Sequence, residues 1–157
     1  MRAIVQRVKN AKVVVEGKTV GQIDSGMLVY LGIGKGDSET DAAFMAEKIA
    51  ELRIFADEND KMNLSVKDAA LRHGSGQAGQ VLIVSNFTLF GDCRKGRRPG
   101  FDLAAEPERA NELYEKVAEL IRQEGIEVQN GVFAANMQVY SQNDGPINFL
   151  IDSEKLF

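Results

Sequence analysis

The sequence predicts one α+β domain over residues 1–157, built from mostly antiparallel strands and two principal helices. Three observations predict it. Short segments of alternating or continuously apolar residues recur along the chain, as in strands, while two longer segments carry apolar residues at helical spacing. The chain is also 44% hydrophobic without a repeat or a linker, which suits a single core.

The N-terminal part predicts strands joined by tight turns. Residues 2–8 alternate between two faces, and residues 12–15 and 19–23 flank Glu16-Gly17-Lys18, which predicts a hairpin with glycine at a position of positive φ. Residues 27–33 form a continuous apolar run, which is typical of a strand covered on both faces.

The middle of the chain predicts a helix followed by less regular segments. Ser38 and Asp41 resemble a capping box, and an apolar stripe follows at helical spacing, formed by Ala42, Met45, Ile49 and Leu52. A return to strand is expected at 53–56. Residues 57–63 predict a turn, and residues 71–80 predict a flexible glycine-containing loop.

The C-terminal half predicts a long strand, a helix and three shorter strands. Residues 81–90 are apolar and rich in β-branched side chains. The helix spans about 107–124, with proline in its first turn and Gly125 after its end. Its buried face is formed by Ala110, Leu113, Val117, Leu120 and Ile121. The three further strands are expected at 126–134, 137–141 and 147–152.

Charge and composition exclude several classes of protein. The net charge of −4 disfavours a uniformly basic nucleic-acid binder. No apolar run is long enough to span a bilayer, and the N-terminal MRAIVQRVKN alternates instead of forming a signal peptide. The single cysteine, Cys93, fits a reducing compartment. We therefore expect a cytoplasmic protein that does not associate with membranes.

Familiar cofactor and catalytic patterns are incomplete. GIGKGD at 32–37 has the wrong glycine spacing for a dinucleotide site and lacks the Ser or Thr that follows the lysine of a P-loop. The segment that begins at Asp57 departs from a calcium loop at Lys61 and Met62. The only histidine, His73, has no evident carboxylate partner and predicts an exposed loop residue. Any hydrolysis would therefore use backbone donors, a hydroxyl or groups of the substrate.

Two segments carry candidate site residues. In the strand predicted at 81–90, Asn86 and Thr88 share one face and Ser85 lies on the other, either to satisfy local hydrogen bonds or to line a pocket. In NDGPIN, residues 143–148, a Gly-Pro pair lies between two predicted strands. A turn is the simple interpretation, whereas a cis bond would project two carbonyls in a rigid arrangement.

Together these segments resemble a known family. Ser85-Asn86-Phe87-Thr88-Leu89 is similar to the SQFTL motif, and NDGPIN is similar to the NxGPVT motif, of the D-aminoacyl-tRNA deacylases. The resemblance extends over MRAIVQRV, AEKIAELRIFADENDKMN, RKGRRPGF and GVFAANMQV. It implies a small β-barrel-like α+β fold, a homodimer with its pocket at the subunit interface, and no metal or cofactor. The implied substrate is a tRNA whose 3′-terminal adenosine carries a D-amino acid, or mischarged glycine, as an ester.

The resemblance also implies roles for single residues. Gly145 and Pro146 would hold the substrate's amino group with their carbonyls and exclude an L side chain by clash, reaching in from the partner subunit. Arg7 would brace that turn, which Asn148 ends. Ser85, Asn86, Phe87 and Thr88 would form the catalytic strand, Phe133 and Met137 would contact the terminal adenine, and the tRNA phosphates would meet Arg94, Lys95, Arg97 and Arg98.

Several alternatives stay open at the level of the sequence. In one alternative the Thr88 hydroxyl is the nucleophile. In the other, water attacks with help from the ribose 2′-hydroxyl, and backbone N–H groups stabilise the oxyanion. Asn86 replaces the glutamine of the family motif, and Asn148 replaces its final threonine. A dimeric protein that binds tRNA ends or D-amino acids without hydrolysis, or an unrelated amidase that uses Thr88, would need many of the same residues. The basic cluster is also consistent with a solvated loop.

Overall fold

A six-stranded sheet is organised around the long strand β1 (Arg2–Val15). The computed structural model of the protein describes residues 1–73 and 78–156. Along one edge β1 pairs with β8 (Gln138–Asp152), and along the other it pairs with β3 (Ser25–Gly32) and β2 (Lys18–Ile23), always antiparallel. The sheet then continues in parallel through β6 (Ala78–Ser85) and β7 (Val128–Asn130). The sheet is therefore mixed: the predicted antiparallel order holds around β1 but not around β6.

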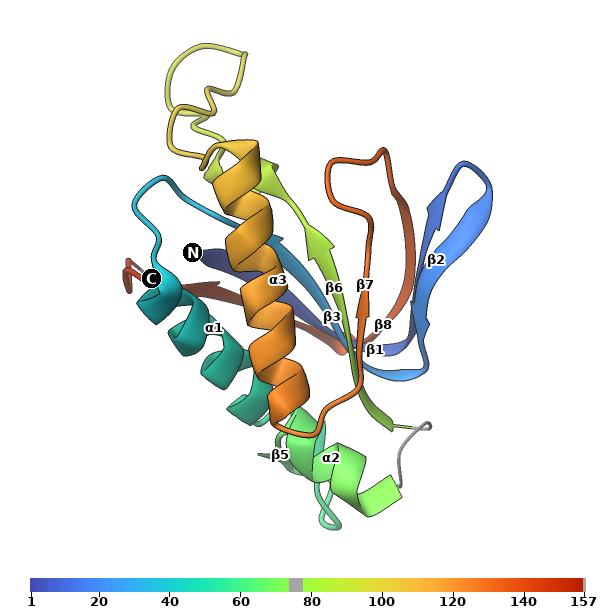
Figure 1. The fold of residues 1–157 in the computed structure, drawn as a ribbon. Helices are drawn as coiled ribbons and strands as arrows, with labels where there is room; N and C mark the ends of the chain where they lie inside the picture. The colour runs from blue at the N-terminus through green and yellow to red at the C-terminus, as the bar shows by residue number, and fades with distance from the viewer. Residues whose placement is uncertain (74–77, 157) are drawn as a thin grey trace.

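The sheet curls until its first and last strands meet. Gly21 of β2 lies against β7, since a Cβ atom at position 21 would stand 2.6 Å from the carbonyl oxygen of Asn130 and 3.1 Å from Leu82 of β6. Glycine is thus needed here for a close approach of two backbones. This contact nearly closes the sheet into a barrel, as the resemblance implies (Figure 1).

The predicted hairpin between β1 and β2 is confirmed. Its two turn residues, Glu16 and Gly17, have φ of 50° and 76°. Positive φ at both central positions is the requirement of the two-residue hairpin turn that matches the twist of the flanking strands. The sequence signal at Gly17 was therefore sufficient to place this turn.

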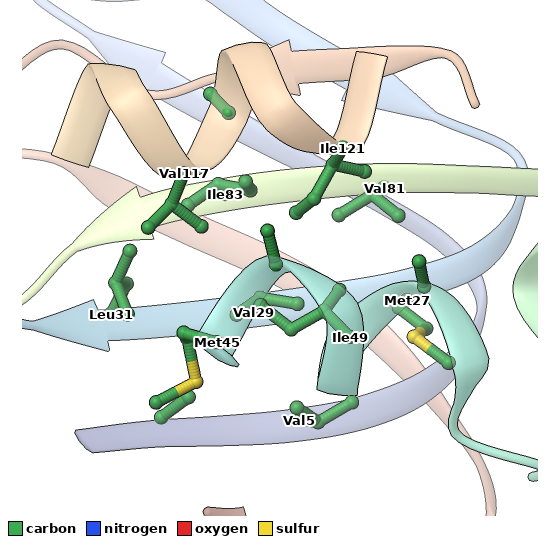
Figure 2. Close-up of a cluster of buried hydrophobic side chains, with 14 of the residues drawn as sticks. Val5, Met27, Val29, Leu31, Met45, Ile49, Val81, Ile83, Val117 and Ile121 are labelled. Atoms are coloured by element: carbon green, nitrogen blue, oxygen red, sulfur yellow. The ribbon is translucent and has the colours of Figure 1, made fainter. Parts of the chain in front are cut away.

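Each face of the sheet carries its own core. Inside the barrel the core consists of side chains from β1, β2, β3 and β6, namely Val8, Ala11, Val13, Ile23, Leu28, Leu82 and Val84. The opposite face is covered by α1 (Glu39–Glu51) and α3 (Pro107–Gln123), as Figure 1 shows. Figure 2 shows Met45 and Ile49 of α1 and Val117 and Ile121 of α3 packed over β3 and β6. Burial on both faces explains why β3 is continuously apolar.

Both predicted helices are confirmed, together with their ends. Ser38 and Asp41 form the capping box of α1, in which the Ser38 amide donates to Asp41 Oδ2 at 2.9 Å. The proline that begins α3 occupies its first turn, where its missing N–H costs nothing. Gly125 follows the end of α3 with φ of 80°.

A third helix, α2 (Val66–His73), was not predicted. It begins with a second capping box, in which the Ser65 amide donates to Asp68 Oδ2 at 2.9 Å and the Asp68 amide donates to Ser65 Oγ at 3.1 Å. The prediction of a loop over 71–80 is wrong at both ends, because α2 continues to His73 and β6 begins at Ala78. Residues 74–77 of that predicted loop and the side chain of His73 lie outside the described residues.

Three predicted strands have different bounds. The strand expected at 81–90 ends at Ser85, and a 3₁₀ helix, η1 (Phe87–Phe90), follows. The strand expected at 126–134 is only β7, while the return expected at 53–56 is β4 (Phe55–Ala56), which pairs with β5 (Met62–Leu64) around the predicted turn. Within the described residues, no helix is both long and apolar enough to cross a membrane.

The two strands expected at 137–141 and 147–152 are one strand, β8. Its pairing with β1 continues on both sides of NDGPIN, since Asn143 faces Val8 and Asn148 faces Gln6. Only one β1 residue, Arg7, therefore lies opposite residues 144–147, which stand out as a bulge. The prediction of a turn between separate strands is wrong, because both flanks add to the same edge of β1.

Candidate functional site

An apolar pocket of about 460 Å³ opens where β3 and β6 end. Its walls come from four segments of the chain: the end of β3, the end of β6 with Ser85, Asn86 and Phe87, the segment that leads into α3, and the loop between β7 and β8 that carries Phe133 and Met137. Five of the predicted site residues are thus brought together. Their convergence at one mostly apolar cavity is typical of a small-molecule site.

The floor of the pocket includes Tyr114 of α3, which the sequence reasoning missed. Its hydroxyl donates a buried hydrogen bond to the carbonyl of Ile83 at 2.8 Å, and its ring lies 6.1 Å from that of Phe133. Burial raises the pKa of Tyr114, so the phenol stays neutral and is unsuited to accept a proton. The sequence did carry a signal that Tyr114 is buried, because it lies beside Leu113 and Val117 on the apolar stripe of α3.

Backbone contacts fix the loop that carries Phe133 and Met137. The amide of Gly131 donates to the carbonyl of Ile83 at 2.9 Å, which continues the β6–β7 ladder into the loop. Ala134, at the tip, has φ of 59°, an uncommon conformation for a residue other than glycine. The turn leaves Phe133 and Met137 half-buried on the same pocket wall.

Asn86 shapes the turn after β6. Its side-chain oxygen Oδ1 accepts hydrogen bonds from the amide of Thr88, at 3.2 Å, and from the Thr88 hydroxyl. This cap starts the 3₁₀ helix and ends the regular strand, so the predicted alternation of faces does not hold beyond Ser85. The amide of Phe87 has no hydrogen-bond partner within the part of the chain that the structure describes.

Thr88 is held away from the pocket. Its side chain is exposed and does not line the cavity, and its hydroxyl proton is directed to Asn86. A nucleophilic hydroxyl needs a base to receive its proton. A neutral amide oxygen is not such a base, so the local geometry does not prepare Thr88 for attack.

The Gly-Pro bulge lies apart from the pocket within one chain. The Gly145–Pro146 peptide is cis, and neither residue lines the cavity. Asn143 anchors the bulge, because its side-chain nitrogen donates to the carbonyls of Arg7 at 2.9 Å and Ile147 at 3.2 Å. Asn148 ends the bulge and accepts a hydrogen bond from Gln6 at 2.9 Å.

Arg7 contacts the bulge from β1. Its Nε lies 3.1 Å from Asp144 Oδ2, an ion pair whose angle is not that of a hydrogen bond. Its terminal nitrogen donates to the carbonyl of Ile54 at 2.7 Å, which ties the bulge to the segment after α1. The sequence reasoning did not single out Asn143, which precedes the bulge, or Asp144, which begins it, although both lie in the NDGPIN segment.

The basic cluster lies on a closed loop next to the pocket. Reciprocal backbone hydrogen bonds between Asp92 and Gly100, at 2.7 and 3.0 Å, close the loop, which projects beyond the start of α3 in Figure 1. The Arg94 side chain donates two hydrogen bonds to Asp92, at 2.7 and 2.9 Å, and its guanidinium holds the pKa of Asp92 well below its usual value. Lys95, Arg97 and Arg98 are exposed and have no ion-pair partner among the described residues.

Comparisons with known proteins identify the family of the chain. The model of the D-Tyr-tRNA(Tyr) deacylase family matches residues 4–152. Curated proteins named D-aminoacyl-tRNA deacylase from Thermotoga petrophila and Koribacter versatilis are 54% and 55% identical over 157 residues, and each alignment covers the whole of both chains.

Solved structures show the same fold. One titled c-Myc DNA Unwinding Element Binding Protein superposes with a TM-score of 0.85 at 36% identity, covering 97% of this chain and 98% of that chain. A probable eukaryotic D-amino acid tRNA deacylase superposes with a TM-score of 0.75 at 15% identity, covering 96% and 97%. The chain therefore belongs to the D-Tyr-tRNA(Tyr) deacylase family.

Proposed function

We propose that this protein hydrolyses the ester bond of D-aminoacyl-tRNA, and of glycine mischarged on tRNA, in the cytoplasm. The products are free tRNA and the amino acid. The observation that carries the proposal is the full-length identity of 54% to curated D-aminoacyl-tRNA deacylases, in a chain with both the SNFTL and NDGPIN segments. The reaction protects translation from D-residues.

The active form is a homodimer in which each pocket receives the Gly-Pro bulge of the partner subunit. Within one chain the pocket and the bulge are separate, which supports an arrangement across two copies. Strand β8 also exposes the large apolar side chains of Tyr140, Phe149 and Leu150 beside an edge that pairs with no other described strand. Such apolar edges are usually covered by a partner.

Substrate selection follows from where the amino-acid side chain can go. The carbonyls of Gly145 and Pro146 of the partner subunit hold the substrate's amino group, so that an L side chain would point into the backbone. Exclusion by clash rejects every L residue regardless of its chemistry, whereas glycine is accepted because it has no side chain. Phe133 and Met137 hold the terminal adenine by apolar contact.

The chemical step uses water and backbone donors. Water adds to the ester carbonyl with help from the ribose 2′-hydroxyl. The Phe87 amide, which has no partner among the described residues, stabilises the oxyanion. The bond from the carbonyl carbon to the 3′ oxygen then breaks, and that oxygen leaves with a proton. The Thr88 amide already donates to Asn86, which favours Phe87 as the oxyanion donor and supports a structural role for the Thr88 hydroxyl.

A second candidate is nucleic-acid binding without hydrolysis. It is favoured by the similarity to the c-Myc DNA Unwinding Element Binding Protein at 36% identity, whose name describes a DNA-binding protein. The exposed basic loop is equally compatible with such a function, because phosphate contacts do not require a reaction. Turnover distinguishes the two candidates.

The test is release of labelled amino acid from D-tyrosyl-, L-tyrosyl- and glycyl-tRNA at catalytic protein concentration. We expect multiple turnovers on the D-ester and the glycyl ester, with the L-ester spared. Thr88→Ala should retain most of the activity, while a substrate that ends in 2′-deoxyadenosine should be poor. Tight binding without release would instead support the binding protein, and equal cleavage of both enantiomers would contradict the proposed role of the bulge.

A further inference from the structure

An exposed aromatic pair lies between the pocket and the basic loop. The rings of Phe87 and Phe101 meet edge to face, with centroids 4.9 Å apart and planes at 64°. Phe87 lines the pocket, and both side chains are exposed, by 58% and 39% respectively. Exposed apolar side chains that gather into one patch beside a pocket mark a surface for binding.

The position of Phe101 is fixed by the backbone around it. Its ring packs over Gly91, where an added Cβ would meet the Phe101 ring at 3.2 Å and Pro99 at 3.7 Å. The preceding residue, Gly100, closes the basic loop by pairing with Asp92. Phe101 therefore stands on the path from the pocket to Lys95, Arg97 and Arg98 and is held there before any ligand binds.

We propose that Phe101 is a stacking surface for the nucleobase immediately 5′ of the terminal adenosine of the tRNA. This inference rests on the proposed function and names a contact outside the ester pocket. An edge-to-face pair leaves ring surface uncovered, and single-stranded RNA ends are bound by stacking of bases on such rings. The neighbouring exposed cations match the phosphates that would follow.

Substrates of different length distinguish an effect at this contact from an effect in the ester pocket. Three substrates carry the same D-tyrosyl ester: adenosine, the trinucleotide CCA, and full tRNA. Phe101→Leu preserves apolar bulk against Gly91 but removes the ring, and Phe101→Tyr preserves the ring. We expect Phe101→Leu to lower kcat/KM about tenfold on CCA and tRNA, within the range of base–aromatic stacking, and to leave the adenosine ester unchanged. Phe101→Tyr should behave as the wild type.

A double-mutant cycle assigns the contact to one base. Removing the base of the middle nucleotide of CCA should cost the wild type about tenfold and cost Phe101→Leu nothing further. Phe44→Ala truncates a matched phenylalanine that stacks with Lys48 on α1, and we expect no change on any of the three substrates.

Three outcomes would overturn the inference. Equal losses on the adenosine ester and on CCA would mean that Phe101 only supports Phe87 in the pocket. If Phe101→Leu kept the wild-type kcat/KM on CCA, stacking on this base would be excluded, even if the variant lost activity on full tRNA. A wild-type protein that cleaves none of the D-esters would contradict the proposed function itself, and this result is visible before any variant is made.

Discussion

Asn86 shows how one side chain sets the geometry of the candidate site. By accepting from both the amide and the hydroxyl of Thr88, it turns the chain out of β6 and into a 3₁₀ helix. The same bonds leave the Phe87 amide as the uncommitted donor of this turn within the described residues. The side-chain amide of Asn86 therefore both caps the 3₁₀ helix and leaves the Phe87 N–H as the proposed oxyanion donor.

Gly131 is expected to control the adenine contact through Met137. A Cβ at position 131 would stand 2.6 Å from the Met137 sulfur, so Gly131→Ala must displace that thioether. Because the side chain is flexible, we expect little change in Tm. The KM for a D-tyrosyl ester of adenosine should rise roughly two- to tenfold, the value of a thioether–aromatic contact of about 0.3–1.5 kcal/mol.

The matched control for this prediction is Gly36→Ala. A Cβ at position 36 would have no neighbour within 4 Å, so neither KM nor Tm should change. An unchanged KM in Gly131→Ala would show that Met137 does not contact the adenine.

At the scale of elements, the bulge in β8 depends on strand pairing that continues on both sides of it. Asn143 forms its two hydrogen bonds inside this interruption, to Arg7 on β1 and to Ile147 at the far end of the bulge. These bonds replace the ladder contacts that residues 144–147 cannot make. The position of the Gly145 and Pro146 carbonyls is consequently set by β1 as well as by β8.

Removal of this anchor should affect both stability and selectivity. We expect Asn143→Ala to lower the free energy of unfolding by about 1–3 kcal/mol, because two partly buried hydrogen bonds are lost. The ratio of D-tyrosyl- to L-tyrosyl-tRNA hydrolysis should fall at least about tenfold, since small misplacements of positioning groups are costly. Denaturant unfolding and paired turnover assays measure the two effects.

The control for Asn143→Ala lies next to it in the same strand. Gln142→Ala removes an exposed hydrogen bond to Asn10 across the same pair of strands, and we expect a change within about 0.5 kcal/mol. If Asn143→Ala lowered stability but left the D/L ratio intact, the anchor would be structural only.

For the whole molecule, the main electrostatic feature is a local basic loop on an acidic protein. The net charge of −4 repels RNA in general, while the exposed cations at 95, 97 and 98 attract it beside the pocket. We expect Arg94 to contribute less to this attraction than its neighbours, because its guanidinium is already paired with Asp92. This distribution should orient tRNA so that its 3′ end reaches the pocket.

The contribution of the loop is measured by salt dependence. We expect Arg97→Ala to raise KM for D-tyrosyl-tRNA and to make the plot of log KM against log salt concentration shallower by about 1, the value of one phosphate contact. Lys18→Ala, at an exposed position at the start of β2, should leave the slope unchanged. Hydrolysis of the adenosine ester should not respond to either variant, and a wild-type slope in Arg97→Ala would exclude this phosphate contact.

Local sequence signals were sufficient for much of the fold. The hairpin turn at Gly17, the capping box at Ser38 and the end of α3 at Gly125 were predicted because each depends on hydrogen bonds or dihedral angles within a few residues. The missed helix α2 carries the same type of signal at Ser65, but its eight residues are too few for a clear apolar period.

The sequence by itself determined which residues carry the family motifs, together with the α+β class. Only the tertiary structure decided that Asn86 ends β6, that β8 continues through the bulge, and that Phe101 lies against Phe87. The bond from Asn143 to the carbonyl of Arg7 joins residues 136 positions apart. Such contacts depend on how strands pair and how the sheet curls, and patterns among neighbouring residues do not predict them.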